Sequence, residues 1–521
     1  MMDNFQEYIA IFLIWLAATI LFQAILTKTR SSKLHLPPSP LALPIIGHFH
    51  LLQPSLHRAV QEISNRYGPL IQLYLGSNPT VFVGSAEIGK EILKTHEVCF
   101  ANRPANIAIS SLTYDKSDLA FAPYGTFWKF MKKLCMSELL NGRMLELLSP
   151  IREEEIKRLL ETLRKKGEAS EAVNVVDELL KLTNSIVMRM AISKSCFDIH
   201  NDDADKVIEM VKESALLSAK FNLQDHFWFC KGFDFQGFGK KVKEVREKFD
   251  IMLEGIIQEH EEDRRCQKST GNNDGAKDVL DALLTISEDQ SSEVKITRDN
   301  IKGFLMDMFG GGTDTTAATI EWALAELINH PTVMEKARNE IDLLVTSSGK
   351  PRIVIESDIP NLPYIQAIVK EALRLHPPSP FIMRESSENC TINGFHIPAR
   401  TKILINVWAI GRDPKNWDNP LEFKPERFLG TKGQTLEVRG QHFQFLPFGS
   451  GRRGCPGTSL ALNVAHTSLA AMIQCFKWKV VGENIVNGVI DMEEGPSFIL
   501  SRAQPLICIP KSRLVPFPSV S

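Results

Sequence analysis

Apolar residues recur along most of the chain with the period of an α-helix, between shorter runs that suggest strands. The longest amphipathic patterns extend over Met144 to Leu163, Lys206 to Ala219 and Ile301 to Ile328. Apolar positions spaced three to four residues apart predict helices with one buried face. The β-like runs lie at residues 70–74, 80–83 and 403–407. From residue 49 onward, these patterns predict a mainly α body with small β-sheets.

Residues 8–26 depart from this pattern because they are nearly all apolar. Their number matches what a helix needs to cross the hydrocarbon core of a bilayer. The basic residues Lys28, Arg30 and Lys33 follow the stretch, which predicts that the rest of the chain is cytoplasmic and that residues 1–7 are lumenal. A cleaved signal peptide is the main alternative, but it would begin with basic residues. The acidic start favours an uncleaved transmembrane anchor.

Residues 27–48 follow as a basic and proline-rich hinge. The prolines between Leu36 and Gly47 fix φ and remove backbone donors, so this stretch cannot be helical. A semi-extended spacer is expected there, between the anchor and a body formed by residues 49–521. A second irregular stretch, Cys266 to Lys277, is rich in small and polar residues and is expected to form an exposed loop.

Charge and cysteine content exclude several classes of protein. The chain has 521 residues with 60 basic and 62 acidic side chains, a net charge of -2, so no nucleic-acid partner is indicated. Its nine cysteines are odd in number and form no CxxC pair, which argues against a zinc site or a dithiol motif. Eight of them are interpreted as reduced thiols in a cytosol-facing protein.

The ninth, Cys455, lies in a glycine-rich stretch that runs from Phe448 to Gly457 and precedes a helical pattern over Ser459 to Phe476. Glycines allow a backbone to approach a large flat ligand closely, and a helix N-terminus beside a sulfur favours the thiolate form. A tight turn around a buried cysteine is the simpler interpretation of such a stretch when it stands alone.

A second unusual stretch, Gly311 to Thr316, lies inside the long helical pattern that begins near Ile301. Two glycines and an Asp–Thr pair in mid-helix weaken it, and Thr side chains can bond back to the carbonyl four residues earlier and distort the helix. A buried kink without chemistry is one interpretation.

The two stretches together resemble the cytochrome P450 family. The residues from Phe448 to Gly457 fill every fixed position of its signature, FxxGxRxCxG, and two further motifs follow the family's order: Glu371 to Arg374 (ExxR) and Pro425 to Phe428. The resemblance implies a P450 fold in which Cys455 binds the iron of haem b. The haem would be bound non-covalently, since no CxxCH is present. Glu371, Arg374 and Arg427 would then form a supporting network.

The resemblance also assigns roles to individual residues. Asp314 and Thr315 match the acid–alcohol pair that delivers protons during oxygen activation. The expected cofactor-binding residues are Trp128, Lys132, Arg384, Phe448, Arg453 and Gly457. Several of these would supply basic or indole donors to the haem propionates, although Lys132 stands where the family usually has arginine.

The resemblance implies a monooxygenase of the endoplasmic reticulum membrane. Electrons would come from NADPH through a separate P450 reductase, because the chain has no flavin or nicotinamide fingerprint. The stretches Val438 to Phe448, Asn406 to Pro414 and Asp491 to Gly495 look like the plant group that contains flavone synthase II, 2-hydroxyisoflavanone synthase, dihydroxypterocarpan 6a-hydroxylase and β-amyrin 24-hydroxylase. Two alternatives are a reductase-independent isomerase or dehydratase of the same fold, and a haem-binding protein without turnover.

A flavonoid or isoflavonoid substrate is expected, with a triterpenoid as the alternative. The segments that line the family's pocket supply mainly apolar and aromatic side chains, which favour an apolar ligand. The apolar and aromatic side chains supplied by these segments are Phe121, Tyr124, Phe221, Phe309, Phe381, Ile382, Met383, Phe498 and Ile499. Some of these are expected to fill the core instead.

Overall fold

The computed structural model describes residues 14, 15, 18, 35–193, 201–270, 278–346, 352–430, 436–482, 485–486, 489–495, 499–514 and 517. Most of the predicted anchor, residues 27–34 of the hinge, and Phe498 lie outside these residues. Among the described residues, no helix has both the length and the apolar character that a membrane span requires. The chain divides into two compact units, which are described separately.

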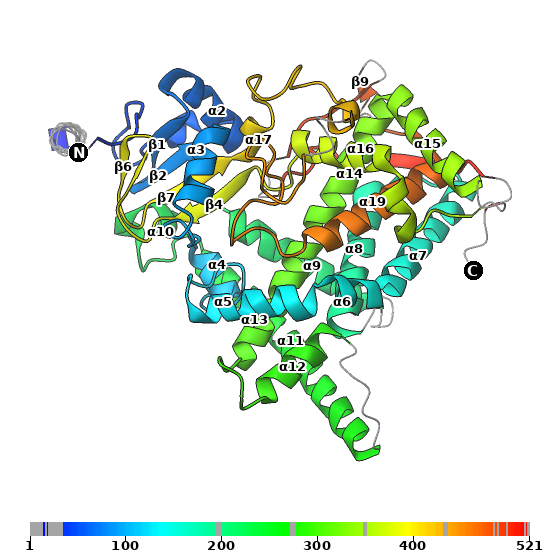
Figure 1. Ribbon diagram of the computed structural model, residues 1–521. Coiled ribbons are helices and arrows are strands. Elements are labelled where there is room, and N and C mark those ends of the chain that lie inside the picture. The colour runs from blue at the N-terminus through cyan, green and yellow to red at the C-terminus, as the bar shows by residue number, and fades with distance from the viewer. Residues whose placement is uncertain are drawn as a thin grey trace, which may run out of the picture. The chain divides into compact units, whose positions relative to one another are not determined.

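The first unit contains a mixed sheet whose strands are ordered β1-β2-β7-β4 (Figure 1). It is formed by the chain up to Pro104 together with Asn222–Phe235 and Phe381–Ile410. Strand β2 pairs antiparallel with β1 and parallel with β7, which in turn pairs antiparallel with β4. The strands are β1 (Leu70–Leu75), β2 (Asn78–Val83), β4 (Phe381–Glu385), β7 (Lys402–Asn406) and a separate hairpin, β5 (Cys390–Ile392) and β6 (Phe395–Ile397).

A small apolar core joins this sheet to helix α2. Ile71, Leu73 and Phe82 of the sheet are fully buried against Val60 and Ile63. The helical elements of the unit are η1 (Phe49–Leu51), α2 (Leu56–Tyr67), α3 (Ala86–Lys90), η2 (Glu91–Thr95), α10 (Leu223–His226), η4 (Trp228–Cys230) and α17 (Val407–Ile410). The strands predicted near residues 70, 80 and 403 are thus confirmed.

The second unit holds the long helices and a small sheet ordered β3-β11-β8. Its helices are α4 (Ile107–Leu112), α5 (Thr126–Leu134), η3 (Cys135–Leu139), α6 (Gly142–Leu147), α7 (Ser149–Glu168), α8 (Val175–Ile192), α9 (Asn201–Ala219), α11 (Phe238–Thr270), α12 (Val279–Glu288), α13 (Arg298–Gly312), α14 (Asp314–Asn329), α15 (Pro331–Thr346), η5 (Glu356–Asn361), α16 (Pro363–Leu375), η6 (Pro425–Phe428) and α19 (Thr458–Cys475). The strands are β3 (Val173–Asn174), β8 (Phe476–Val480), β9 (Ile485–Val486), β10 (Val489–Ile490) and β11 (Ile507–Ser512).

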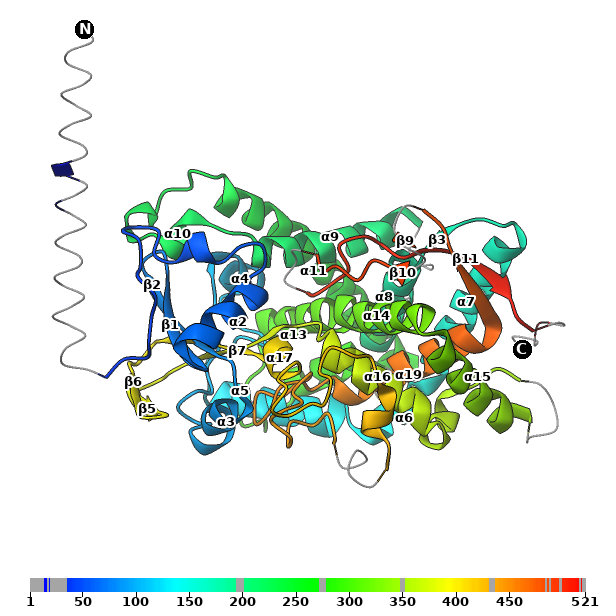
Figure 2. The same cartoon turned by 90° about the horizontal axis from the view of Figure 1, so that it is seen from above.

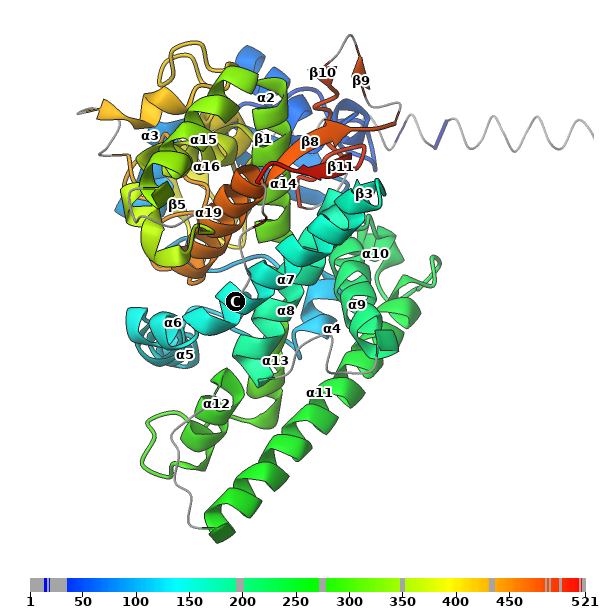
Figure 3. The ribbon, with the colours of Figure 1, turned by 90° about the vertical axis from the view of Figure 1, so that its right-hand side faces the viewer.

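Helix α14 forms the centre of this unit. It packs against α8, α16 and α19, and its residues from Thr316 to Leu327 are all buried. A helix covered on every side in this way is mostly apolar, and Trp322 is completely buried within it, although Glu321 and Glu326 are buried there too. Figure 2 shows α13 and α14 following one another through the unit, and Figure 3 shows β8 beside β11 near α7.

Two predicted helices are interrupted, and one predicted loop is partly wrong. The pattern from Met144 to Leu163 divides into α6 and α7, because Pro150 in the first turn of α7 cannot continue the preceding helix. The pattern over Ile301 to Ile328 divides at Thr313. In the stretch expected to be a loop, Cys266 to Thr270 belong to α11, since Gln and Lys allow a helix to continue.

Candidate functional site

Backbone hydrogen bonds within the loop around Cys455 fix its conformation. The Cys455 amide donates to the Phe448 carbonyl at 2.9 Å, and the Gly454 amide donates to the Gly451 carbonyl at 2.9 Å. Gly451 has a φ of 70°, in the left-handed region that side chains disfavour. The Cys455 thiol is exposed, and α19 begins directly after Gly457. The structure thus presents this sulfur just before a helix N-terminus.

A neighbouring stretch supports this loop from behind. Gly440 has a φ of 75° and lies so close to the backbone of Gly449 that a Cβ atom would overlap its carbonyl oxygen. The Ser450 hydroxyl donates to the Gly440 carbonyl at 2.6 Å. The Lys132 ammonium, which comes from α5, donates to the Gly454 carbonyl at 3.0 Å. Lys132 therefore contacts the cysteine loop directly.

Arg453 and Trp128 meet on the segment that precedes α5. The Arg453 guanidinium lies over the Trp128 ring, 4.3 Å from its centre, and is almost fully buried. It donates to the Ala122 carbonyl at 2.5 Å and to the Ala120 carbonyl at 3.3 Å. The Trp128 indole N–H donates to the Leu119 carbonyl at 3.0 Å. The structure thus brings two of the predicted propionate donors together beside Cys455.

The remaining predicted cofactor-binding residues divide between the units. Phe448 and Gly457 lie in the cysteine loop, with Phe448 packed against the main apolar core. Arg384 belongs to β4 of the first unit, where it is buried and donates to the Met383 carbonyl at 2.8 Å. The propionate role of these side chains stays a prediction.

The Asp314–Thr315 pair lies where α13 ends and α14 begins. Burial raises the pKa of the Asp314 carboxyl, which Lys212 partly opposes. The Thr315 hydroxyl donates to the Gly311 carbonyl at 2.7 Å, the bond expected to distort the helix. The adjacent Thr313 hydroxyl is buried and finds no partner within the described part of the chain. The predicted interruption is therefore present and leaves polar groups available.

The ExxR motif forms a buried network, as the resemblance implied. Glu371 and Arg374 are joined by two hydrogen bonds of 2.7 and 2.8 Å, and both are almost completely buried. The Arg427 guanidinium donates to the same Glu371 carboxylate at 2.8 Å. Arg374 also donates to the carbonyls of Gly411 and Pro420 at 2.6 and 2.7 Å. This network ties α16 to the stretch that leads to the cysteine loop.

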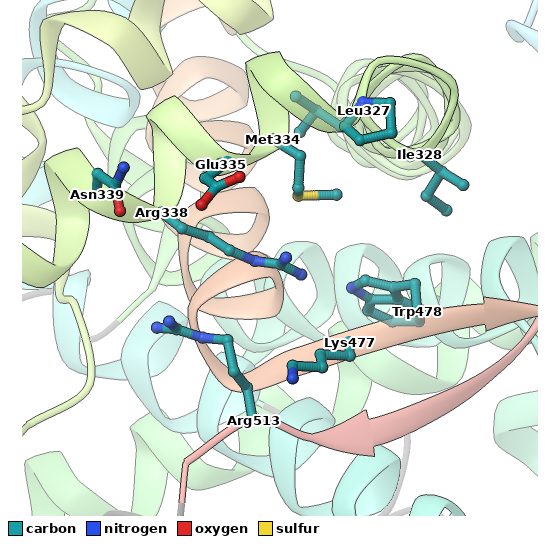
Figure 4. Close-up of a pocket in the computed structure, with 10 residues that line it drawn as sticks. Leu327, Ile328, Met334, Glu335, Arg338, Asn339, Lys477, Trp478 and Arg513 are labelled. Carbon is teal, nitrogen blue, oxygen red and sulfur yellow. The ribbon is translucent and has the colours of Figure 1, made fainter.

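A pocket that none of the predicted residues lines lies between α14, α15 and β8 (Figure 4). Its two arginines are engaged with the carboxyl end of α19. Arg338 donates to the Ile473 and Phe476 carbonyls at 3.1 and 2.9 Å, and Arg513 donates to the Gln474 carbonyl at 2.6 Å. Cations at a helix C-terminus stabilise it, so these side chains have a structural role.

Two residues of the site region are absent from the predicted set. Asp307 and Asp118 accept from the backbone amides of residues 119–121, in the segment whose carbonyls at 119, 120 and 122 accept from Arg453 or Trp128. The sequence does contain a signal for Asp307: it lies inside the apolar helical pattern that begins near Ile301. A carboxylate buried there needs a hydrogen-bond partner.

Comparison with known proteins decides the family. A model of the family described as Cytochrome P450 matches residues 37–508.

The chain belongs to the cytochrome P450 family.

Among curated relatives, 3,9-dihydroxypterocarpan 6A-monooxygenase of Glycine max is 52% identical, over 98% of this chain and 99% of its own. Beta-amyrin 24-hydroxylase of Glycine max is 45% identical over 99% and 100% of the two chains, and 2-hydroxyisoflavanone synthase of Glycyrrhiza uralensis is 43% identical over 96% and 98%. A solved zebra fish cytochrome P450, with progesterone, has a TM-score of 0.74 and 27% identity, covering 88% of this chain and all of that one.

These findings confirm the P450 fold and identify a haem-thiolate monooxygenase that works with oxygen and a reductase supplied with NADPH. The residues present fit a haem. A Cβ atom added at Gly310 or Gly311 would meet no atom within 4 Å, so the helix leaves open space beside it. The pKa of Cys135 is raised to about 12, mainly by burial, and both Asp307 and Cys455 contribute. The cysteine loop and α13 thus lie near the same thiol.

Proposed function

We propose that Cys455 is the axial haem ligand of this monooxygenase. The supporting observation is that its exposed thiol lies at an open loop before α19, with buried Arg453 and Trp128 beside it. When bound, the haem would supply oxygen activation, and the Cys455 thiolate would favour it by donating electron density. Lys132 and Arg453 would hold the propionates and keep the cysteine loop in place.

Asp314 and Thr315 are proposed to move protons to the reacting oxygen. Burial raises the pKa of the Asp314 carboxyl, and Lys212 partly opposes this, so the carboxyl holds a proton more readily than an exposed aspartate would. The Thr315 hydroxyl is bonded to the Gly311 carbonyl, and rotation about χ1 would turn it toward the open space beside Gly311. The interrupted helix would let water join this path.

A flavonoid or isoflavonoid is proposed as the substrate. The observation that carries this proposal is the 52% identity, over nearly the whole chain, to an enzyme named for a dihydroxypterocarpan. A second relative is named for an isoflavanone. A triterpenoid is the alternative, because a 45% identical relative is named for β-amyrin.

The residues that the sequence predicted to line the pocket have different surroundings in the structure. Phe121 and Tyr124 are partly exposed, and the Tyr124 hydroxyl accepts from Arg452 of the cysteine loop at 3.0 Å. Aromatic rings of this kind suit a flat polyphenol. Phe309 is fully buried in the apolar core. Phe381 lies in the first unit, with its ring 6.1 Å from that of Phe82.

Spectral titration of the purified holoprotein tests the substrate. We expect saturable haem absorbance shifts with 3,9-dihydroxypterocarpan or a flavanone, and turnover of the same compound with NADPH and reductase. Omitting the reductase is the control, since a reductase-independent isomerase would remain active without it. Tight shifts with β-amyrin and none with the phenolic compounds would replace the proposal by the triterpenoid alternative.

Residues 8–26 are proposed to anchor the enzyme in the endoplasmic reticulum membrane with the body in the cytoplasm. The apolar length of this stretch and the basic residues after it support the proposal. Flotation of the full-length protein with microsomal membranes, and protection of residues 1–7 from added protease, test it.

A further inference from the structure

The segment Ser117–Ala122 lies along one face of α13. The Asn300 amide donates to the Ser117 carbonyl at 3.0 Å. One turn later, a Cβ atom at Gly303 would lie 3.2 Å from the Asp118 backbone. After another turn, one Asp307 carboxylate oxygen accepts from the Leu119 amide at 2.7 Å and from the Ala120 amide at 3.0 Å. Residues at this spacing share one helix face, so three successive turns hold the segment.

The two carboxyl groups of Asp118 and Asp307 meet at this contact. Asp118 is fully buried and accepts from the Phe121 amide at 3.1 Å. Its carboxyl is hydrogen-bonded to that of Asp307, whose pKa is raised well above the usual range by burial and then by the Asp118 charge. A hydrogen bond between two carboxyl groups needs a proton, and two adjacent charges of the same sign cannot both form cheaply. The pair therefore carries one shared proton.

Other charged groups on the elements packed against α13 already have partners or face other residues. In α11, Asp250 and Glu254 bind Lys302, and in α8 Arg189 binds Glu155. Lys212 of α9 acts on Asp314, and Cys135 of η3 is a buried thiol. In α12, the backbone of Asp281 accepts from Arg264. The opposite side of the segment meets Arg453. Asp118 is thus the group whose charge acts on Asp307.

The same peptide units connect this pair to the cysteine loop. The amides of Leu119 and Ala120 point to Asp307, and their carbonyls accept from Arg453 at 3.3 Å each. Leu119 also accepts from the Trp128 indole. Any shift of the segment on α13 would therefore move the acceptors that fix Arg453, two residues before Cys455.

We propose that Asp118 and Asp307 form a shared-proton pair that positions the 117–122 segment between α13 and Arg453. They are positioning residues for the monooxygenase reaction, because they act through Arg453 and through the placement of Phe121. Loss of the shared proton at alkaline pH would put two charges side by side and loosen the segment. The inference rests on the proposed role of Cys455 only for its effect on the haem.

Asp307→Asn separates this role from simple packing. The Asn carbonyl can accept from the Leu119 and Ala120 amides while its NH₂ group donates to Asp118, which reproduces the protonated acid but cannot titrate. Asp307→Leu has similar bulk but removes the acceptor of both amides and the carboxyl that is hydrogen-bonded to Asp118. Asp299→Asn, at an exposed position of the same helix, is the matched control.

Hydrogen exchange of the haem-loaded, full-length protein measures the protection of the backbone amides in residues 117–122 and needs no substrate. Corrected for intrinsic rates, the amides of Leu119 and Ala120 should lose protection as the pH rises through the raised pKa of Asp307 in the wild type and in Asp299→Asn. Protection should stay constant in Asp307→Asn. It should fall about tenfold at every pH in Asp307→Leu, as expected for lost hydrogen bonds.

Thermal unfolding gives an independent readout. A carboxyl whose pKa is raised in the folded state binds more protons than in the unfolded state, so stability falls as pH rises above the ordinary carboxyl pKa. The Tm of Asp307→Asn relative to the wild type should therefore increase with pH. If Asp307→Leu does not load haem, Asp118→Asn serves as the second test of the pair. This variant also removes the shared proton, so its stability should depend on pH in the same way as that of Asp307→Asn. Equal pH dependence in wild type and Asp307→Asn would overturn the proposal, whatever the result for Cys455.

Discussion

At the scale of single residues, Cys455 and Cys266 are the exposed cysteines among those that the structure describes. Burial raises the pKa of Cys135, Cys475 and Cys508 to about 12, so these thiols are unreactive at neutral pH. Cys266 is exposed like Cys455, but it lies on the surface helix α11 without a glycine-rich loop. The sequence motif was sufficient to select Cys455, because its glycines encode the backbone shape of the loop.

Cys455→Ser should abolish the thiolate-type spectrum of the reduced carbon monoxide complex, because a serine hydroxyl does not supply a thiolate ligand. The spectrum of the purified variant, recorded after haem reconstitution, measures this. Cys266→Ser is the control and should keep the wild-type spectrum. A Cys455→Ser protein with an unchanged spectrum would contradict the assignment of the axial ligand.

Thr315→Ala should keep the haem but divert reducing equivalents from product to peroxide, since the variant loses the hydroxyl proposed to pass on protons. Coupling is measured as product formed per NADPH consumed, with hydrogen peroxide quantified in parallel. Thr319→Ala is a matched control, because the Thr319 hydroxyl makes the same kind of bond, 2.8 Å to the Thr315 carbonyl. The two neighbours Thr313 and Thr316 can replace part of the function, so partial uncoupling is expected. Undiminished coupling would show that the relay assignment is wrong.

At the scale of elements, the period of apolar residues predicted helices well and their ends less well. The predicted start of α19 differs by one residue from the observed one, because glycines end the preceding loop. The division between α6 and α7 was not predicted, because the apolar period continues across Leu148. The helix itself cannot continue there, because Pro150 has no backbone N–H to donate. The predicted distortion at Gly311 to Thr316 was found because glycine and threonine encode it locally.

The ExxR network should be essential for folding, whereas an exposed pair with the same spacing should not. Glu371→Ala leaves Arg374 and Arg427 without their carboxylate in a buried site, which costs about 3–5 kcal/mol in comparable cases. Glu161→Ala removes one of the two carboxylate partners of Arg164, at the same spacing on the surface of α7, and its effect should be small. Thermal unfolding and haem content measure both. Equal effects would contradict the supporting role of the network.

The contact between α11 and α12 should weaken as pH rises. His260 lies 3.0 Å from Asp278, which caps α12 through the Asp281 amide at 2.9 Å. Burial lowers the pKa of His260, but the hydrogen bond and charge of Asp278 outweigh it and raise the pKa overall.

A histidine pKa raised by folding stabilises the protein below its ordinary pKa, and this contribution is lost as pH rises through the raised value. The wild type should therefore be more stable than His260→Gln below the ordinary histidine pKa of about 6.5 and lose that advantage as the pH rises through the raised value. Thermal unfolding across this range measures the difference. A constant difference would show that the histidine charge does not contribute.

At the scale of the whole molecule, the support of the candidate site comes from contacts that no local pattern encodes. The carbonyls that accept from Arg453 and Trp128 belong to residues 119–122, which match no motif. The Lys132 ammonium donates to the Gly454 carbonyl, although the two residues lie far apart in the sequence. Motifs identified the side chains, since their types are restricted by chemistry. Their backbone partners stayed unpredicted, since a carbonyl is available at every residue type.

The hinge also differs from the semi-extended spacer, separate from the body, that its prolines predicted. In its described part, the Gln72 amide donates to the Pro38 carbonyl at 2.9 Å, and the His48 ring accepts from the Tyr74 amide at 2.8 Å. His48 is fully buried. The hinge from residue 35 onward therefore belongs to the first unit's sheet, beside β1, and a truncation must keep it.

Removing residues 1–27 should leave a protein that folds and binds haem but attaches more weakly to membranes. The deletion takes away the apolar stretch proposed as the anchor and keeps every hinge contact to β1 described above. The reduced carbon monoxide spectrum measures haem binding, and flotation with lipid vesicles measures attachment. Some remaining attachment is compatible with this expectation, because apolar side chains such as Leu41, 87% exposed, stay on the surface. Removing residues 1–48 is the contrasting variant: it also deletes the buried His48, so it should lose folded holoprotein. Loss of folding in the shorter deletion would contradict the proposal that residues 8–26 anchor the enzyme without shaping its site.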